Sequence, residues 1–490
     1  MPASGISRAS HYRHYSVVDP RRRRNRIGSP FVIKLFNHYL HWRTLLRIVF
    51  DFCFVTAVVV FAVMWLGSGL PVDLPMVAAY GAIFAASVLL INTWLGLYQR
   101  IHHRSKAQTR GRAVLVLYLS VPIAYGVFAL LPLAAATRDF LELAAMVGVF
   151  GVLTYHVTTG HADSVLAKHR ILIFGTGARA LEVERTLSQS DPTVEVMGFY
   201  PSANEDSHAV PADRILAANK TLTDTALELQ VDEIVVALTE RRGGSMPLRE
   251  LLDCKLYGIR VLDLASHFEQ TLGQIRLESL YAGWLVFGEG FDQTWRRQFI
   301  KRVFDIFGAI VLLIVTLPIM LLTAIAIVLE SGFPVFYRQE RVGLNGRLFK
   351  VIKFRSMRND AEKDGKPKWA SANDDRTTRV GRIIRKLRID ELPQLICVLD
   401  GDMSLVGPRP ERPYFVDKLV KDIPFYAVRH SVKPGVTGWA QVRHDYGGSF
   451  EGTAEKLQYD LYYVKNHTLF LDLVVLVDTV GVVLTGKGAQ

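Results

Sequence analysis

The stretch "VFDIFGAIVLLIVTLPIMLLTAIAIVLE" at residues 303–330 is apolar over a length that can cross a bilayer as a helix. Basic segments flank it on both sides, "RRQFIKR" at residues 296–302 and "RQERVGLNGRLFKVIKFR" at residues 338–355. Because positive charge gathers on the cytoplasmic side of a crossing helix, two basic flanks indicate a re-entrant hairpin, residues 303–329, that enters and leaves one leaflet. Pro318 lacks a backbone donor and clashes with the preceding turn, so it is the predicted break. An ordinary span with a proline kink is the alternative.

Four further apolar stretches precede this segment, at residues 45–66, 76–97, 113–133 and 140–157. The first and third loops between them are nearly free of Lys and Arg. The second loop, "YQRIHHRSKAQTRGR" at residues 98–112, and the tail at residues 1–44 are strongly basic. The positive-inside rule therefore predicts a four-helix transmembrane bundle at residues 45–160 with both ends in the cytoplasm. The charge alternation disfavours the alternative, four buried helices of a soluble domain.

Composition agrees with a membrane protein of several domains. The chain has 490 residues, is 50% hydrophobic and carries a net charge of +12. The three cysteines, Cys53, Cys254 and Cys397, are too few and too scattered for a disulfide framework or a metal site. The polar tail carries "RRRRNR" at residues 21–26 without a cleavage site, so we expect no cleavable signal peptide. We expect the clustered positive charge to face membrane lipid, and we expect no nucleic acid partner.

A soluble segment at residues 169–293 lies between the bundle and the hairpin. It opens "HRILIFGTGARALEVERTL", which predicts a buried strand, a turn at Gly175 and Gly177, and a helix from about Ala178. Three more strands are expected in "VEVMGFY", "VDEIVVAL" and "GIRVLDL", with helices between them. This alternation is typical of a doubly wound, Rossmann-like α/β domain.

The glycine pattern G-x-G-x-x-A of this domain is a weak signal for dinucleotide binding. The acid that would hold a ribose hydroxyl is missing where the second strand ends at Tyr200, and Glu205 and Asp206 follow only in a loop. A Tyr-x-x-x-Lys pair occurs outside the domain, at Tyr414 and Lys418. We therefore expect no catalytic use of NAD. A regulatory nucleotide or sugar-nucleotide site stays open, as does a structural role that includes a homodimer surface.

The stretch "RTTRVGRIIRKLRIDELPQL" at residues 376–395 is predicted to be a helix that leads basic side chains up to an adjacent acid pair, Asp390 and Glu391. Arginine forks match phosphate oxygens in pairs, which favours a phosphate site. A carboxylate among such cations should keep a low pKa. Asp390 can then hold a divalent metal that bridges phosphates, or attack phosphorus to form an acyl phosphate, with Glu391 moving a proton. The basic residues in question are Arg382, Arg385, Lys386 and Arg388.

A solvated surface helix without chemical function is the alternative for this stretch. The apolar run "LPQLICVL" disfavours it, because that run would bury one side and leave the acids at a pocket edge. The "GPRPE" segment at residues 407–411 fits a pocket, since Pro408 and Pro410 fix the backbone around Arg409 and preorganise its fork. The region from residue 334 on is otherwise polar, basic and short of regular strands, so we expect a small, mostly α, membrane-associated domain.

Five segments in this order resemble the bacterial polyprenyl-phosphate hexose-1-phosphate transferases. They are "KRVFDIFGAIVLLIVTLPIMLL", "KFRSM", "IDELPQLICVLDGDMSLVGPRPE", "KPGVTGWAQV" and "YDLYYVKN". The resemblance covers residues 297–490, and the bundle with its α/β domain is similar to the long form of that family. Where many relatives break the re-entrant helix at Ser-Pro, this chain has Leu317 before Pro318.

The resemblance implies transfer of a sugar-1-phosphate from a UDP-sugar to undecaprenyl phosphate with release of UMP, as the first step of exopolysaccharide or O-antigen assembly. It also implies Mg²⁺ near Asp390, which would be both nucleophile and metal ligand. Glu391 and Arg385 are the further catalytic candidates. The implied substrate-binding residues are Lys353, Arg355, Arg388, Pro408, Arg409, Glu411 and Asp460. The sugar is not identified, although glucose or galactose is usual in long-form relatives.

We therefore expect a multi-pass protein of the bacterial inner membrane whose catalytic domain, residues 297–490, acts on the cytoplasmic face. The apolar stretch near the C-terminus contains Asp472 and Asp478, which are costly at a bilayer centre, so we expect an interfacial helix there and not a span. Two rival functions are a membrane-tethered nucleotide-sugar dehydratase or reductase and a scaffold for polysaccharide assembly without catalysis.

Overall fold

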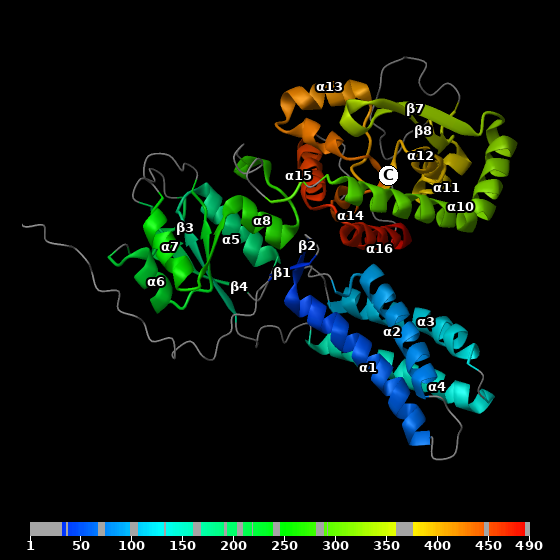
Figure 1. The fold of residues 1–490 in the computed structure, drawn as a ribbon, viewed down its shortest axis with the longest axis horizontal. Coiled ribbons are helices and arrows are strands. Elements are labelled where there is room, and N and C mark those ends of the chain that lie inside the picture. The colour runs from blue at the N-terminus through cyan, green and yellow to red at the C-terminus, as the bar shows by residue number, and fades with distance from the viewer. Residues whose placement is uncertain are drawn as a thin grey trace, which may run out of the picture.

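The structure is a computed structural model. It describes residues 32–35, 38–66, 74–98, 106–131, 134–159, 168–190, 194–202, 209–217, 219–238, 246–280, 289–291, 293–358, 376–444 and 450–485. The basic tail up to residue 31, residues 99–105 of the basic second loop, and the acids Glu205 and Asp206 lie outside the described residues. Figure 1 shows three bodies: a helical bundle, an α/β domain and a C-terminal domain.

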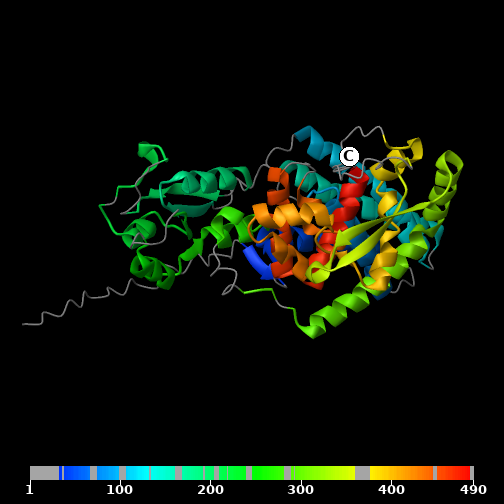
Figure 2. The same cartoon turned by 90° about the horizontal axis from the view of Figure 1, so that it is seen from above.

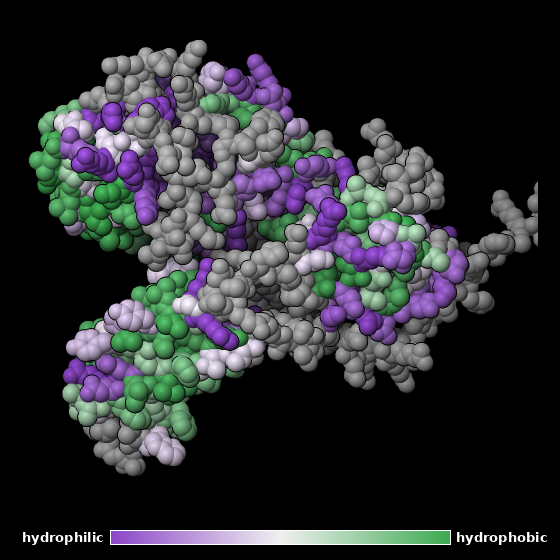
Figure 3. Space-filling model, turned by 180° about the vertical axis from the view of Figure 1, so that it is seen from behind, coloured by the Kyte–Doolittle hydropathy of each residue, from purple (hydrophilic) through white to green (hydrophobic). Residues whose placement is uncertain are grey.

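The bundle begins after a short antiparallel hairpin of β1 (Val32–Leu35) and β2 (His38–His41). Each of the four predicted apolar stretches is a helix, and the four are α1 (Trp42–Leu66), α2 (Leu74–Trp94), α3 (Lys106–Ala129) and α4 (Ala135–Thr159). Within the described residues five helices are long and apolar enough to cross a membrane, these four and α10 (Trp295–Ser331). Hydrophobic side chains cover the outside of the bundle in Figure 3, as a lipid-facing surface requires.

The α/β domain contains the predicted parallel sheet. Its strands lie in the order β4 (Val194–Tyr200), β3 (His169–Phe174), β5 (Glu233–Val236) and β6 (Arg260–Asp263). All three strand pairs are parallel. The helices between and after them are α5 (Ala178–Ser190), η3 (Ala212–Arg214), α6 (Leu222–Glu228), α7 (Leu248–Leu256), α8 (Leu264–Leu272) and η4 (Leu277–Ser279).

Each face of this sheet has its own apolar core. Ile171 and Ile173 of β3 pack in one cluster, whereas Leu172 and Phe174 pack in the other, as the period of two along a strand requires. The predicted glycine turn follows β3. Gly175 has φ +124, and a Cβ there would lie 3.2 Å from the Ala237 carbonyl oxygen, so the turn requires glycine.

The C-terminal domain begins with α10 and an antiparallel pair, β7 (Phe336–Val342) and β8 (Leu348–Phe354), joined by η5 (Leu344–Gly346). This pair shows that the expectation of a domain short of regular strands was wrong. Charged residues stand on both faces of these strands and hide the alternation that would predict them. The remaining elements are α11 (Arg379–Lys386), η6 (Ile389–Glu391), α12 (Gln394–Asp400), β9 (Ser404–Val406), α13 (Pro413–Asp422), η7 (Tyr426–Ser431), β10 (Gly435–Thr437), α14 (Trp439–Arg443), α15 (Phe450–Asn466) and α16 (Leu469–Thr485).

Helix α10 is assigned as one helix of 37 residues with Pro318 inside it. A straight helix of that length would extend about 55 Å. Figures 1 and 2 show instead that the ribbon of α10 changes direction and follows the edge of the C-terminal domain. Pro318 therefore lies inside a bent helix. The predicted break appears as a bend in α10, and the helix continues through Pro318.

Both ends of α10 are bound to the same part of the C-terminal domain. Near its start, the Arg302 guanidinium donates to the backbone oxygens of Val398 (2.5 Å) and Leu399 (2.7 Å) at the end of α12. At its other end, the Glu330 carboxylate accepts from the first two amides of α11, at 2.8 and 2.9 Å. Since α11 and α12 enclose the acid pair, the bent helix and the acid pair form one structural unit.

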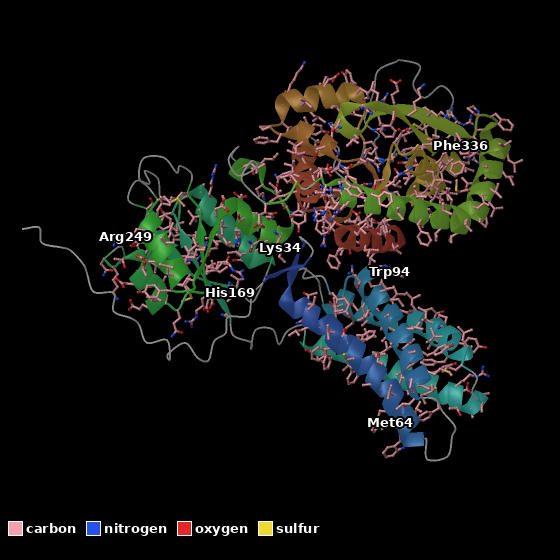
Figure 4. The ribbon with its side chains drawn as sticks, viewed as in Figure 1. Lys34, Met64, Trp94, His169, Arg249 and Phe336 are labelled. Carbon is pink, nitrogen blue, oxygen red and sulfur yellow. The ribbon has the colours of Figure 1, made fainter. Side chains whose placement is uncertain are left out.

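The C-terminal domain contacts both other bodies. Helix α16 packs against α2, and a Cβ on Gly481 would lie 2.5 Å from the Trp94 carbonyl oxygen. Figure 4 shows Trp94 at the end of α2 that faces α16. At the joint with the α/β domain, the Glu269 carboxylate of α8 accepts from Lys465 (2.7 Å) and Asn466 (2.8 Å). The α16–α2 contact attaches the C-terminal domain to the bundle end that adjoins the second loop, and the Glu269 contact attaches it to the α/β domain.

Candidate active site

The acid pair lies in a bend between two short helices. Thr378 caps α11 by accepting from the Gly381 amide at 2.9 Å. The chain then leaves helical geometry at Arg388, which has φ +58, and Pro393 precedes α12. The expectation of one helix through this stretch was therefore wrong, because Arg388 and Pro393 break it. The bend turns Asp390 and Glu391 inward, where their exposed fractions are 9% and 8%.

The packing of α12 agrees with the prediction that the acid pair lies at the edge of a pocket. Leu395, Cys397 and Val398 of α12 are buried in the main apolar core of the domain, as the apolar run in the sequence predicts. Arg382 and Lys386 are exposed, whereas Arg385 and Arg388 are half-buried beside the acids. The burial of Asp390 and Glu391 disfavours a fully solvated surface helix for this stretch.

Glu391 carries the ion pairs of the site. It accepts from Lys353 of β8 at 3.0 Å and from Arg409 at 2.6 Å, and Arg388 lies 3.8 Å away. Burial disfavours the charged form, but Arg409 and Lys353 outweigh that effect and hold the pKa of Glu391 well below its usual range. Glu391 is therefore ionised at neutral pH.

Asp390 differs from its neighbour. Its carboxylate makes no hydrogen bond to any other described residue, although Lys353, Arg409 and Arg385 act on it through their charges. Burial, followed by the negative charge of Glu391, raises the pKa of Asp390 to about 6. The expectation of a low pKa was therefore wrong. The cations bond to Glu391, so Asp390 keeps both the cost of burial and the repulsion of a like charge.

Arg409 projects from the rigid segment at residues 407–411. Its fork meets both oxygens of Glu391, at 2.6 and 3.5 Å. The backbone oxygens from Pro408 to Glu411 each accept a hydrogen bond. The donors are the amides of Gly435 (3.0 Å) and Val342 (2.9 Å) and the side chains of Arg429 (2.8 Å) and Arg341 (3.1 Å). Glu411 itself forms a 3.5 Å ion pair with Arg341.

Two predicted substrate-binding residues lie in other surroundings. Arg355 is buried and donates to the backbone oxygens of Ser331 (3.0 Å) and Gly332 (2.5 Å) at the end of α10. Asp460 of α15 is buried and pairs with Arg429, at 2.8 and 3.1 Å. The structure does not bring either of them into hydrogen-bond contact with the acid pair, and their role in substrate binding stays a prediction.

Arg429 is a residue that the sequence reasoning did not identify. It is 6% exposed, lies in η7, and donates to Asp460, to the Tyr426 hydroxyl and to the Arg409 carbonyl. A signal for it exists, because "IPFYAVR" at residues 423–429 ends an apolar run with a single arginine. A lone cation in such a run indicates a buried ion pair.

The residues fit the implied Mg²⁺ only together with a phosphorylated ligand. Among the described residues no group of three His, Cys, Asp or Glu side chains could hold a metal ion. Lys353 and Arg409 engage the oxygens of Glu391, which leaves Asp390 as the candidate ligand. Mg²⁺ commonly binds through one or two carboxylates plus substrate phosphates, so one carboxylate suffices if phosphates supply the rest.

Comparison with known proteins identifies relatives of the C-terminal domain. Residues 296–486 match the family described as "Bacterial sugar transferase". The chain is 44% identical over 242 residues to a "UDP-N-acetylgalactosamine-undecaprenyl-phosphate N-acetylgalactosaminephosphotransferase" of Aeromonas hydrophila, which covers 49% of this chain and 56% of that protein.

Two further matches cover most of the relative. The "Uncharacterized sugar transferase EpsL" of Bacillus subtilis is 45% identical over 195 residues, 39% of this chain and 90% of that protein. A "UDP-glucose:undecaprenyl-phosphate glucose-1-phosphate transferase" of Caulobacter vibrioides is 45% identical over 193 residues, 39% of this chain and 71% of that protein. The printed names differ in the sugar, which is N-acetylgalactosamine in one relative and glucose in another.

Proposed function

The chain belongs to the bacterial sugar transferase family, and we propose that it transfers a sugar-1-phosphate from a UDP-sugar to undecaprenyl phosphate. Relatives whose names state this kind of reaction support the proposal. The product would be the first lipid-linked sugar of an exopolysaccharide or O-antigen unit. Because the named relatives differ in their sugar, the substrate class is a UDP-hexose or a UDP-N-acetylhexosamine.

The observation that carries the proposal is the contrast inside the acid pair. Asp390 is buried, next to three cations, and has no hydrogen bond to another described residue. A largely buried carboxylate with cations around it, a raised pKa and no hydrogen bond to another described residue is typical of a functional site. Lys353, Arg385 and Arg409 surround it with the charge that a diphosphate needs.

In the proposed mechanism the Asp390 carboxylate attacks the sugar-linked phosphorus of the UDP-sugar. A bond forms between the carboxylate oxygen and phosphorus, and the phosphoanhydride bond to UMP breaks, so UMP leaves. An oxygen of undecaprenyl phosphate then attacks the same phosphorus and releases Asp390. The low pKa of Glu391 keeps it ionised, so its task is to hold Lys353 and Arg409 in place around the reacting phosphate.

We propose Mg²⁺ as the metal of this reaction, held by Asp390 and by the phosphates of the donor. When bound, it would supply positive charge to the departing UMP. Arg409 and Lys353 supply the fixed positive charge of the protein at the same place.

We propose that α10 is re-entrant and that the C-terminal domain lies on the cytoplasmic face of the inner membrane. Both ends of α10 bind the α11–α12 unit, which supports a helix that returns to the side of the membrane from which it entered. Apolar side chains of α10, such as Phe307 (69% exposed) and Leu322 (68% exposed), face outward. Figure 3 shows a hydrophobic edge on the C-terminal domain, where α10 lies. The contact of α16 with Trp94 supports this side, because Trp94 ends α2 at the bundle end that the positive-inside rule assigns to the cytoplasm.

One assay tests the transfer reaction. The full chain, purified in detergent, is mixed with UDP-glucose or UDP-N-acetylgalactosamine, undecaprenyl phosphate and Mg²⁺, and UMP is measured. We expect UMP with at least one donor, and with an excess of enzyme we expect a sugar-phosphate adduct on Asp390 in the absence of the lipid. Loss of water from the UDP-sugar or hydride transfer would favour a dehydratase or reductase, and no reaction with any UDP-sugar would favour a scaffold.

Cysteine accessibility tests the topology. In a chain without its native cysteines, single cysteines are placed at the exposed positions Gln298 and Arg347, before and after α10. Both should resist a membrane-impermeant thiol reagent in intact cells and react after lysis. Labelling of the position 347 cysteine from outside would mean that α10 crosses the membrane.

A further inference from the structure

We propose that Arg429 and Asp460 form a positioning pair that fixes Arg409 against Glu391, and that Asp460 therefore acts through Arg429 without touching substrate. The inference rests on the proposed transferase function for its kinetic consequence. Its structural part stands on the described contacts alone.

The first step is the anchoring of Arg409. Its backbone oxygen accepts from the Arg429 guanidinium at 2.8 Å. Pro408 and Pro410 on either side have fixed φ angles. Of the four hydrogen-bonded carbonyls in this segment, the one that Arg429 holds belongs to the residue whose side chain meets Glu391. A shift at this carbonyl moves the fork of Arg409 relative to Glu391, which it meets at 2.6 Å.

The second step is the fixing of Arg429 itself. Its Nε and Nη2 atoms both meet one oxygen of Asp460, at 3.1 and 2.8 Å, and its Nη1 atom donates to the Tyr426 hydroxyl at 2.8 Å. Arg429, Asp460 and Tyr426 are 6%, 3% and 2% exposed. A planar guanidinium with partners on three sides has one orientation, so the pair determines where the Arg409 carbonyl lies.

The third step is the path to the reacting group. Glu391 is adjacent to Asp390, and Arg409 is one of the two cations that hydrogen-bond Glu391. Contacts therefore run without interruption from Asp460 through Arg429 and Arg409 to the acid pair. This path explains why a buried acid of α15, far along the chain from Asp390, matters to the site although it makes no hydrogen bond there.

The kinetic test is a double-mutant cycle. Arg429→Lys keeps a charge for Asp460 but cannot bond Asp460, Tyr426 and the Arg409 carbonyl together. We expect kcat for UMP release to fall roughly a hundredfold with a smaller change in KM, because misplacement by about 1 Å has that cost. In an Arg409→Lys background the same change should cost less than about threefold, since the residue it positions is gone. Additive effects in the cycle would overturn the proposal.

A structural readout separates this inference from the proposed function. Hydrogen–deuterium exchange of the full chain should increase in peptides that cover residues 404–412 when Arg429 becomes Lys, and should not change in α5 of the α/β domain. Unchanged exchange at residues 404–412, or an equal increase throughout the C-terminal domain, would overturn the positioning role even if the wild-type chain releases no UMP.

Asp478→Asn is the matched control. It breaks another ion pair of the same domain, the 3.3 Å pair in which the Asp478 side chain is 9% exposed and the Arg443 side chain 34%, and no described hydrogen bond or ion pair joins Asp478 to residues 407–411. We expect this variant to keep kcat within about threefold of wild type and to leave exchange at residues 404–412 unchanged. If it reproduced the Arg429→Lys effects, loss of any buried pair would explain them and the proposal would fail.

Discussion

Two buried ionic clusters of the C-terminal domain follow opposite rules. At the joint with the α/β domain, each oxygen of Glu269 has one donor, Lys465 on one and Asn466 on the other. At the acid pair, the two carboxylates lie near four cations, which are Lys353, Arg385, Arg388 and Arg409. The carboxylate of Asp390 nevertheless has no hydrogen bond to another described residue. Both clusters are largely buried, with Glu269 3% exposed and Asp390 9% exposed.

The difference separates a structural cluster from a reactive one. A buried charge with all its partners holds two domains in register, although it adds little net stability. A buried charge without a hydrogen bond raises the free energy of the folded state and is available to another reactant. The comparison therefore predicts which substitutions affect activity and which affect stability.

The largest expected effect is on catalysis. Asp390→Asn keeps the shape of the side chain but removes the carboxylate that attacks phosphorus, so UMP release and the sugar-phosphate adduct should both disappear. Asp400→Asn, an exposed acid at the end of α12, is the control and should retain full activity. A substantial fraction of wild-type activity in Asp390→Asn would show that this carboxylate is not the nucleophile.

The second effect concerns the joint. Glu269→Gln leaves the Lys465 ammonium buried without its counter-charge, so the free energy of unfolding should fall by about 3 kcal/mol. Denaturant titration of the detergent-solubilised chain measures this loss, and the specific activity of the folded fraction should stay close to wild type.

The control at the joint replaces both charges. A Glu269→Met, Lys465→Met variant should recover most of the lost stability, because no unpaired charge then remains. If Glu269→Gln abolished UMP release while the protein stayed folded, the joint would take part in catalysis. The distinction between a structural cluster and a reactive one would then be wrong.

The sequence predicted the elements whose signals are local. The four apolar stretches became α1 to α4, and the alternation at residues 169–264 became a parallel sheet with its glycine turn at Gly175. The strands β7 and β8 were missed because charged residues interrupt their alternation. Elements with a regular spacing of hydrophobic residues could therefore be predicted, and elements without it could not.

The candidate site was predictable in composition but not in its pairings. Lys353, Arg385 and Arg409 were expected near the acids and lie there. The bend at Arg388 decides which of the two acids accepts the hydrogen bonds. This bend was not predicted, because the sequence pattern indicated one unbroken helix. Arg429 was missed because its partners, Asp460 and the Arg409 carbonyl, are distant along the chain. Long-range pairing of this kind leaves no periodic signal.

The third effect is on pH dependence. The pKa of Asp390 lies at about 6, so the rate of the UMP-releasing step should fall as the pH drops through 6, by about tenfold per unit below it. Single-turnover UMP release between pH 5 and 8 measures the midpoint. The negative charge of Glu391 is one cause of the raised pKa, so any residual activity in Glu391→Gln should have a lower midpoint. A midpoint that moves upward would contradict the described coupling.

The smallest effect is on stability at the acid pair and has the opposite sign to that at the joint. The pKa of Asp390 is about 6 in the folded chain, above the usual value of a free aspartate, so stability is lost as the pH rises from about 4 to 6 and the cost is fully present above 6. Asp390→Asn removes that cost and should raise the free energy of unfolding by roughly 1 to 2 kcal/mol at pH 8. The gain should shrink as the pH falls below 6 and vanish below about 4, where the carboxyl is protonated in both the folded and the unfolded chain. Thermal unfolding of both proteins across this range measures it. A variant that is less stable than wild type at pH 8 would show that Asp390 contributes to the fold as Glu269 does, and the distinction between the two clusters would be lost.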